Sequence, residues 1–152
     1  MKIKLITIGK FHHFHLARQL HKFKLLDEIY SGYPKFKLRD EYGIPANKIK
    51  TYPYYQVPFL FYFKYLNAFS PKINHYLSNL SHKTLSNKVA ENISEANILI
   101  ASSKSGLEAG KKIKKSNGKF ICDRGSTHII FQKEILKEEY KELNMPSNEI
   151  SD

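Results

Sequence analysis

Short apolar runs alternate with stretches of helical periodicity along most of the chain. Residues 2–9 are predicted to form a strand that ends at Gly9, and residues 5–8 within it are nearly continuous apolar, which is typical of a buried parallel strand. Apolar residues at helical spacing follow, so we expect a helix from about Phe14 to Lys24. The alternation then repeats, which predicts further strands at 28–31, 49–52, 97–102 and 119–121 and further helices over 82–94, from 105 and from 127.

Strands that alternate with helices predict an α/β fold, with one open, mainly parallel, Rossmann-like sheet and helices on both faces. We expect a single domain over residues 1–146 and a frayed tail over 147–152. Ligands of such sheets bind beyond the carboxyl ends of the strands. Polar loops follow three of the predicted strands, so we expect them to share one rim of the sheet: 9–13, 102–105 and 123–128.

The third of these loops carries the most distinctive chemistry. We expect a tight turn into a helix, in which Gly125 adopts a backbone conformation closed to other residues and Ser126 caps the first free amides. Those amides, together with Arg124, would then face an anion above the turn. An ordinary strand-to-helix connection with a surface arginine is the alternative for the same residues.

Composition narrows the classes of function. The formal charge of +11 attracts phosphate groups in general, whether on nucleic acid, an anionic membrane or a nucleotide-sugar. Because 41% of the residues are hydrophobic and no apolar run is long enough to span a bilayer, we expect a globular protein. The amino terminus lacks the pattern of a signal peptide, which favours a cytoplasmic protein, with the inner face of the membrane as an alternative location.

Cysteine and histidine usage argues against a metal or a cofactor. Cys122 is the only cysteine and lies in an apolar strand, which predicts a small buried side chain and excludes a cysteine zinc site. His12, His13 and His15 have no carboxylate or cysteine near them in the sequence, so we expect solvated or donor groups rather than metal ligands. No glycine fingerprint follows Gly9, which excludes a nicotinamide or flavin site there.

Residues 52–69 concentrate tyrosine and phenylalanine beside lysines, and two interpretations are open. A helix from about Phe59 could pack into the domain, with its aromatic side chains filling the core. Alternatively, the segment could lie on an anionic membrane surface, where aromatic rings and lysines both contribute. The candidate membrane contacts are Tyr54, Tyr55, Phe59, Phe61 and Lys64. Binding of single-stranded nucleic acid is a less favoured use of the same residues.

The residues from Asp123 onward resemble a known family. The stretch from Asp123 to Ile129, then Gln132, and then the stretch from Ile135 to Tyr140 resemble the end of the amino-terminal domain in family-four glycosyltransferases of the GT-B class. A weaker similarity extends back to Met1. The resemblance implies half of a GT-B fold, namely the acceptor-side domain of a retaining enzyme without a cofactor. Such enzymes transfer sugar from a nucleotide-sugar to a glycan or lipid-linked acceptor, as in cell-envelope polysaccharide synthesis.

The resemblance also implies a set of candidate residues. Arg124 would contact an anion, and His128 would donate a hydrogen bond toward the acceptor or the leaving phosphate. His12 and His13 would line the opposite rim. The full set that would bind acceptor or phosphate is Gly9, Lys10, His12, His13, Ser103, Asp123, Arg124, Ser126 and His128. No catalytic residue is assigned, since Ala101 and Ser102 stand where the family often has a bulky aromatic residue or histidine.

GT-B enzymes have a second domain that binds most of the nucleotide-sugar, and this sequence ends at Asp152 before any such domain. We therefore expect a truncated or split product, with a separate donor-domain chain as its partner. Without the donor half, the nucleotide-sugar is not aligned with the acceptor and the charge of its leaving phosphate is not neutralised. We therefore expect little or no activity from this chain alone. A non-catalytic module that binds an anionic membrane surface is the alternative function, and nucleic-acid binding is the least favoured.

Overall fold

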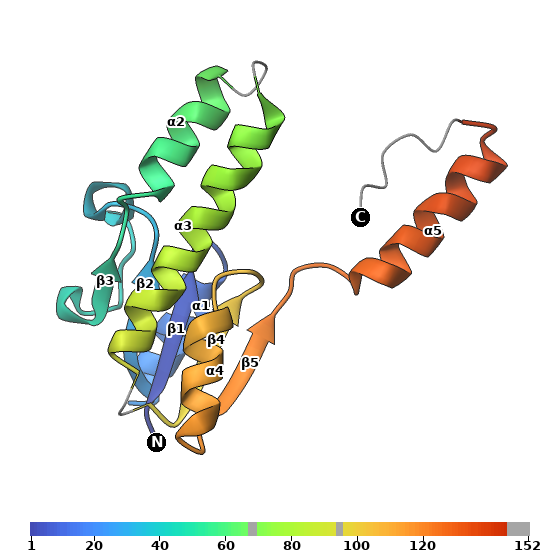
Figure 1. Cartoon of the computed structure of the whole chain (residues 1–152). Helices are drawn as coiled ribbons and strands as arrows, with labels where there is room; N and C mark the ends of the chain where they lie inside the picture. Colours follow the sequence, from blue (N-terminus) through green and yellow to red (C-terminus); the bar gives the residue numbers. More distant parts are fainter. Residues whose placement is uncertain (67–69, 94–95, 146–152) are drawn as a thin grey trace.

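Five parallel strands form one open sheet in the order β3-β2-β1-β4-β5 (Figure 1). The computed structural model describes residues 1–66, 70–93 and 96–145. The strands are β1 (Ile3–Thr7), β2 (Leu26–Ser31), β3 (Ile49–Thr51), β4 (Ile98–Ser102) and β5 (Lys119–Asp123). The predicted α/β fold with an open, parallel, Rossmann-like sheet is therefore confirmed.

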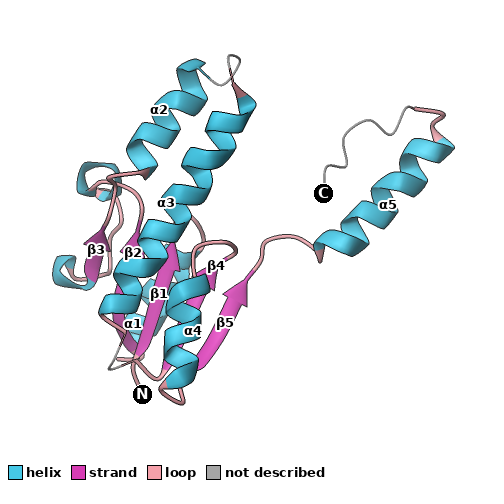
Figure 2. Ribbon diagram, viewed as in Figure 1, coloured by secondary structure: helices cyan, strands magenta, loops and turns pink. Residues whose placement is uncertain are grey.

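Helices cover both faces of the sheet (Figure 2). On one face, Leu85, Val89 and Ile113 from two helices pack against the strands, and on the other face Phe14 and Ala17 do so. The helices are α1 (His13–Lys22), α2 (Gln56–Leu66), α3 (Pro71–Glu91), α4 (Leu107–Lys115) and α5 (Ile129–Glu142), with short 3-10 turns at Lys35–Leu38 and Ala46–Lys48. Thus α3 and α4 cover one face, and α1 covers the other.

The strand order reverses at β1, which pairs with β2 on one side and with β4 on the other. All five residues of β1 are buried, and this explains why the first apolar run is nearly continuous. The carboxyl ends of β1 and β4 therefore flank the point at which an open α/β sheet leaves a crevice for a ligand. Asp123 at the end of β5 is in register with Ser102 at the end of β4, so the last strand ends at the same rim.

Helix α4 packs so closely on the sheet that two of its positions require glycine. A Cβ atom on Gly106 would lie 2.4 Å from the Cβ atom of Ala101. A Cβ atom on Gly110 would lie 2.9 Å from the ring of Phe120. The absence of side chains at these two positions allows β4 and β5 to approach the helix.

The aromatic segment does not fill the core. Helix α3 begins at Pro71, well before the predicted start at 82, and its first half packs against α2 in a hairpin that extends beyond the sheet (Figure 1). On α2, Phe61, Phe63 and Tyr65 are 60%, 52% and 58% exposed. The core interpretation is therefore wrong for these residues, because the hairpin leaves the sheet before they could contact it. The part of the aromatic stretch at 67–69 lies outside the described residues.

Helix α5 is also exposed, although the spacing of its apolar residues predicts a buried face. Its spacing indicates an inward face made of Ile129, Leu136, Tyr140 and Leu143, yet no residue of α5 is buried. An extended connection carries the helix away from the sheet (Figure 1), so the face that spacing defines has nothing to pack against. Cys122 is exposed for a related reason, since β5 is an edge strand. The predicted tail at 147–152 lies outside the described residues.

The close packing of α4 yields a test of the fold. Changing Gly106→Ala forces two Cβ atoms together, so the free energy of unfolding should fall by about 1–3 kcal/mol. Urea unfolding at unchanged m-value measures the loss. Gly125→Ala is the matched control, because no atom lies within 4 Å of its added Cβ, and its effect should stay below about 1 kcal/mol. Equal stability of the Gly106 variant and the original chain would contradict the packing described.

Candidate functional site

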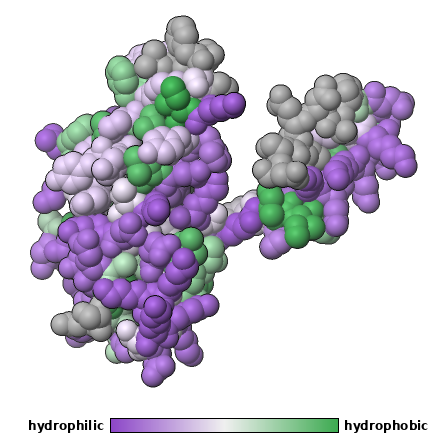
Figure 3. All heavy atoms as spheres, viewed as in Figure 1, coloured by the Kyte–Doolittle hydropathy of each residue, from purple (hydrophilic) through white to green (hydrophobic). Residues whose placement is uncertain are grey.

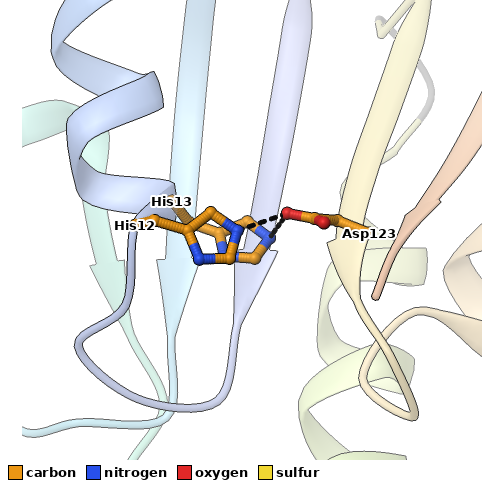
Figure 4. A group of neighbouring side chains, drawn as sticks. All are labelled: His12, His13 and Asp123. Atoms are coloured by element: carbon orange, nitrogen blue, oxygen red, sulfur yellow. Dashed lines mark hydrogen bonds and ion pairs between the residues drawn. The ribbon is translucent and has the colours of Figure 1, made fainter. Parts of the chain in front are cut away.

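The loop after β1 and the end of β5 bring two histidines and one aspartate together (Figure 4). The Nε2 atom of His12 lies 2.5 Å from Oδ2 of Asp123, and the Nε2 atom of His13 lies 3.3 Å from the same oxygen. The two imidazole rings stack, with centroids 4.5 Å apart, so their Nε2 atoms point the same way. The sequence predicts that the loops at 9–13 and 123–128 share one rim with these histidines facing Arg124 and His128, and the structure brings the histidines into direct contact with Asp123.

The two histidines differ in environment. His12 has a side chain that is 60% exposed, whereas His13, in the first turn of α1, is 1% exposed. Burial lowers the pKa of His13, and the neighbouring His12 lowers it further, although the Asp123 carboxylate opposes both. Neither ring nitrogen of His13 has a hydrogen-bond partner. The site therefore contains a buried imidazole whose pKa is lowered and whose ring nitrogens have no hydrogen-bond partner, beside a carboxylate.

The β4–α4 loop joins this site through the backbone. The amide of Ser103 donates a hydrogen bond of 2.9 Å to the carbonyl oxygen of Asp123. Behind it, the hydroxyl of Ser102 donates to Ser105, whose own hydroxyl lies 2.7 Å from Nδ1 of His82. The three loops predicted to share a rim thus meet there, and Asp123 contacts residues of the other two.

Two candidates in the first loop have partners of their own. The ammonium group of Lys10 lies 2.6 Å from Oδ2 of Asp40 and 3.2 Å from Oε1 of Glu41. The hydrogen bond that Lys10 donates to Asp40 raises the pKa of Lys10, and its ammonium group is engaged with these two acids. The carbonyl oxygen of Gly9 accepts a hydrogen bond from the hydroxyl of Thr7. The structure therefore does not bring these two residues to the histidines.

The turn after Asp123 differs from the predicted anion site. Helix α5 begins at Ile129, and its N-cap is His128, whose Nδ1 atom accepts a hydrogen bond from the amide of residue 130. Ser126 instead accepts a 3.2 Å hydrogen bond from Nε of Arg124. Among the described glycines only Gly43 has positive φ, so Gly125 does not take the special conformation expected of it. The amides near Ser126 consequently do not form a helix N-terminus.

Sequence reasoning missed two residues of α3, the buried Ser86 and the half-buried His82. Spacing indicates that Ser105 caps α4, but the hydroxyl of Ser86 accepts hydrogen bonds from the amides of Glu108 and Ala109 instead. This cap comes from another helix, so no local motif could have revealed it. His82, one turn earlier on the same helix, approaches the β4–α4 loop, and its position beside the apolar stripe of α3 is the available sequence signal.

The cluster of His12, His13 and Asp123 can act on protons, on hydroxyl groups or on a metal ion. An imidazole paired with a carboxylate accepts a proton from, or donates one to, a bound hydroxyl group. The ligand atoms of the three residues all lie within 4.8 Å of one another. No metal site was expected because the sequence places no carboxylate near these histidines, and the structure overturns that reason by supplying one from β5.

Comparisons with protein-family models, with curated proteins and with solved structures found no match. Within the described ranges, 1–66, 70–93 and 96–145, no helix combines the length and the apolar character that crossing a bilayer requires. The observations that bear on function are therefore the fold, the rim cluster and the exposed surfaces of the chain itself.

The half-buried His82 predicts a pH dependence of stability. Burial, and secondarily Lys104, lowers the pKa of His82 to about 4 from an ordinary 6.5, so the unfolded chain binds more protons between these values. Stability contributed by neutral His82 is therefore present above pH 6.5 and is lost as the pH falls toward 4, by about 2–3 kcal/mol. Urea unfolding from pH 7 to pH 4 should show that His82→Asn flattens this slope. His75→Asn, at an exposed position of α3, should not. An unchanged slope in the His82 variant would refute the assignment.

Proposed function

We propose that the chain is the acceptor-side half of a retaining glycosyltransferase of the GT-B class. The observation that supports it best is that the loops after β1, β4 and β5 meet at the rim of the sheet, beside the point where the strand order reverses at β1. Resemblance of the stretch from Asp123 to Tyr140 to the end of such a domain supports the same function. This function needs a cleft with polar groups at the rim, and the cluster around Asp123 supplies one wall of it.

In this proposal, different residues of the rim bind the acceptor and the leaving phosphate. The pair of His12 and Asp123 binds a hydroxyl group of the acceptor and accepts its proton as the hydroxyl attacks the sugar. Arg124 carries an exposed guanidinium group whose Nε atom already donates to Ser126, which leaves the remaining donors for an anionic oxygen of the leaving phosphate. The formal charge of +11 attracts anionic substrates to the protein as a whole.

Transfer also requires a donor half, on this polypeptide or on a separate one. That half holds the nucleotide-sugar and neutralises its diphosphate, while the present half holds the acceptor. The reaction breaks the bond between the sugar and the diphosphate and forms a bond to the acceptor oxygen, whose proton leaves. Because alignment of donor and acceptor and neutralisation of the leaving group provide most of the acceleration, neither half is active alone.

The proposal predicts transfer only when both halves are present. A GT-B donor-half polypeptide, a panel of radiolabelled nucleotide-sugars and a lipid-linked acceptor fraction would be mixed with the chain, and label on the acceptor would be counted. Label should transfer to the acceptor with the chain and to nothing without it. Arg124→Ala should lower the rate by about tenfold to a hundredfold, because a charged contact to the leaving group is removed.

A matched control distinguishes the contact between Arg124 and the leaving phosphate from the effect of removing any one positive charge. Lys111 lies on the outer surface of α4, where it pairs with Glu108 at 3.1 Å, and Lys111→Ala removes one positive charge without touching the rim. The rate should be unchanged in this variant. Transfer that is equally fast in the Arg124 and Lys111 variants would exclude the assigned role of Arg124, and failure with every donor half and donor would exclude the transferase.

A second candidate function is docking on an anionic membrane surface, and the exposed α2–α3 hairpin favours it. Lys64 lies on α2 among aromatic residues, and its ammonium group lies 5.0 Å from the centroid of the Tyr65 ring. Hydrophobic side chains also reach the surface along this hairpin in Figure 3. A hollow of about 310 Å³ beside α2 is lined by Tyr33, Pro34, Phe36, Lys37, Val57, Leu60, Phe61 and Lys64. Aromatic and cationic groups together suit the interface of an anionic bilayer.

Membrane docking predicts vesicle binding that depends on lipid charge and on salt. The chain should sediment with vesicles that contain an anionic lipid at low salt and should be released as salt rises. The double change Phe61→Ser and Phe63→Ser should weaken binding by about tenfold or more, because two exposed rings no longer enter the interface. Phe23→Ser, at the equally exposed end of α1, is the control and should bind normally. Absence of binding at low salt would eliminate this function.

A further inference from the structure

We propose that His12, His13 and Asp123 bind a divalent transition-metal ion of the Zn²⁺ class. These three residues come from two elements whose sequence positions are more than a hundred residues apart, yet their ligand atoms all lie within 4.8 Å of one another (Figure 4). This proposal does not depend on the glycosyltransferase function, because it concerns the binding of an ion by the chain itself.

The buried imidazole of His13 is the observation that separates a metal site from an ordinary ion pair. A hydrogen-bonded pair of His12 and Asp123 would explain those two residues alone. It would leave His13, which is 1% exposed, with two ring nitrogens that have no hydrogen-bond partner. A polar group is rarely buried in that state, because it loses its bonds to water without replacement. A metal ion bound at Nε2, which faces Asp123, supplies a partner for that one of the two nitrogens.

The distances suit a small ion with four ligands. Bonds from zinc to imidazole nitrogen and carboxylate oxygen are about 2.0–2.2 Å, so two ligand atoms of a tetrahedral site lie about 3.3–3.5 Å apart. The observed separation between Nε2 of His13 and Oδ2 of Asp123 is 3.3 Å. His12 sits closer, at 2.5 Å, in a direct contact that an ion would replace. Because His12 is the most exposed of the three, its side chain can make that small adjustment.

The set of ligands identifies the class of ion. Calcium and magnesium prefer oxygen ligands, whereas two imidazoles and one carboxylate suit zinc and its transition-metal neighbours. Three protein ligands leave at least one position open. The exposed edge of His12 places that position at the rim of the sheet, where water or an anionic oxygen of a bound molecule can reach it.

Rigid elements hold two of the three ligands. His13 lies in the first turn of α1 and is packed against the sheet, and Asp123 is the last residue of β5. The hydrogen bond from the amide of Ser103 to the carbonyl oxygen of Asp123 fixes the end of that strand. Ligands placed on a helix and a strand are positioned more accurately than ligands on loops, and this lowers the cost of assembling the site.

The experiment measures binding of the metal alone to the chain, freed of any affinity tag and treated with a chelator. Co²⁺ would be titrated while its visible absorption is recorded, and Zn²⁺ affinity would follow from competition. One ion per chain is expected, with an absorption band typical of nitrogen and oxygen ligands. Asp123→Asn and His12→Gln should each weaken Zn²⁺ binding at least tenfold.

His15→Gln is the matched control, since His15 lies on the same helix with its Nδ1 atom beside Arg18 and away from the cluster. Its affinity should equal that of the original chain. Both test variants change exposed or half-exposed side chains, and far-ultraviolet circular dichroism would verify that they fold. Absence of stoichiometric binding, or an Asp123→Asn variant that binds as tightly as the control, would overturn the proposal.

Discussion

Pairing of β1 on both of its edges is the constraint on which the rest of the structure depends. β1 is hydrogen-bonded to β2 on one side and β4 on the other, and because helices cover both faces of the sheet it is buried throughout. Its one charged residue, Lys4, is paired with Asp27 and Glu28. The reversal of strand order at β1 then decides where a ligand can bind. It also decides which loops meet, because parallel strands deliver their following loops to the same rim. The histidines after β1 therefore face the end of β5 across β4.

Asp123 connects these loops in two ways. Its carbonyl oxygen accepts a hydrogen bond from Ser103, and its carboxylate faces both histidines. One residue thus combines a structural contact with a chemical one. The carboxylate of Asp123 can take part in proton transfer with His12, or it can bind a metal ion together with both histidines. Which of the two occurs depends on whether an ion is bound at the Nε2 atom of His13. The transferase and the metal site are separate proposals that share His12 and Asp123, and a bound ion would replace the direct contact between these two residues that the transferase uses.

Surfaces outside the sheet account for the exposed apolar groups. The α2–α3 hairpin and α5 both extend from the body, and both present apolar side chains that no described residue covers (Figure 3). Lysines accompany the aromatic residues of the hairpin, whereas charges of both signs accompany α5. Large exposed apolar patches are characteristic of surfaces that contact a partner or a membrane. The buried core, by contrast, is divided between the two faces of the sheet.

The sequence by itself determined the order of strands and helices and the loops that share a rim, because apolar periodicity and parallel topology are sufficient for those features. Only the tertiary structure decided that Asp123 lies against His12 and His13, that Ser86 caps α4, and that α5 and Cys122 are exposed. Spacing indicates which side chains share a face, but not what covers that face. Contacts between distant segments depend on how the helices and strands pack against one another, and the periodicity of apolar residues does not contain that information.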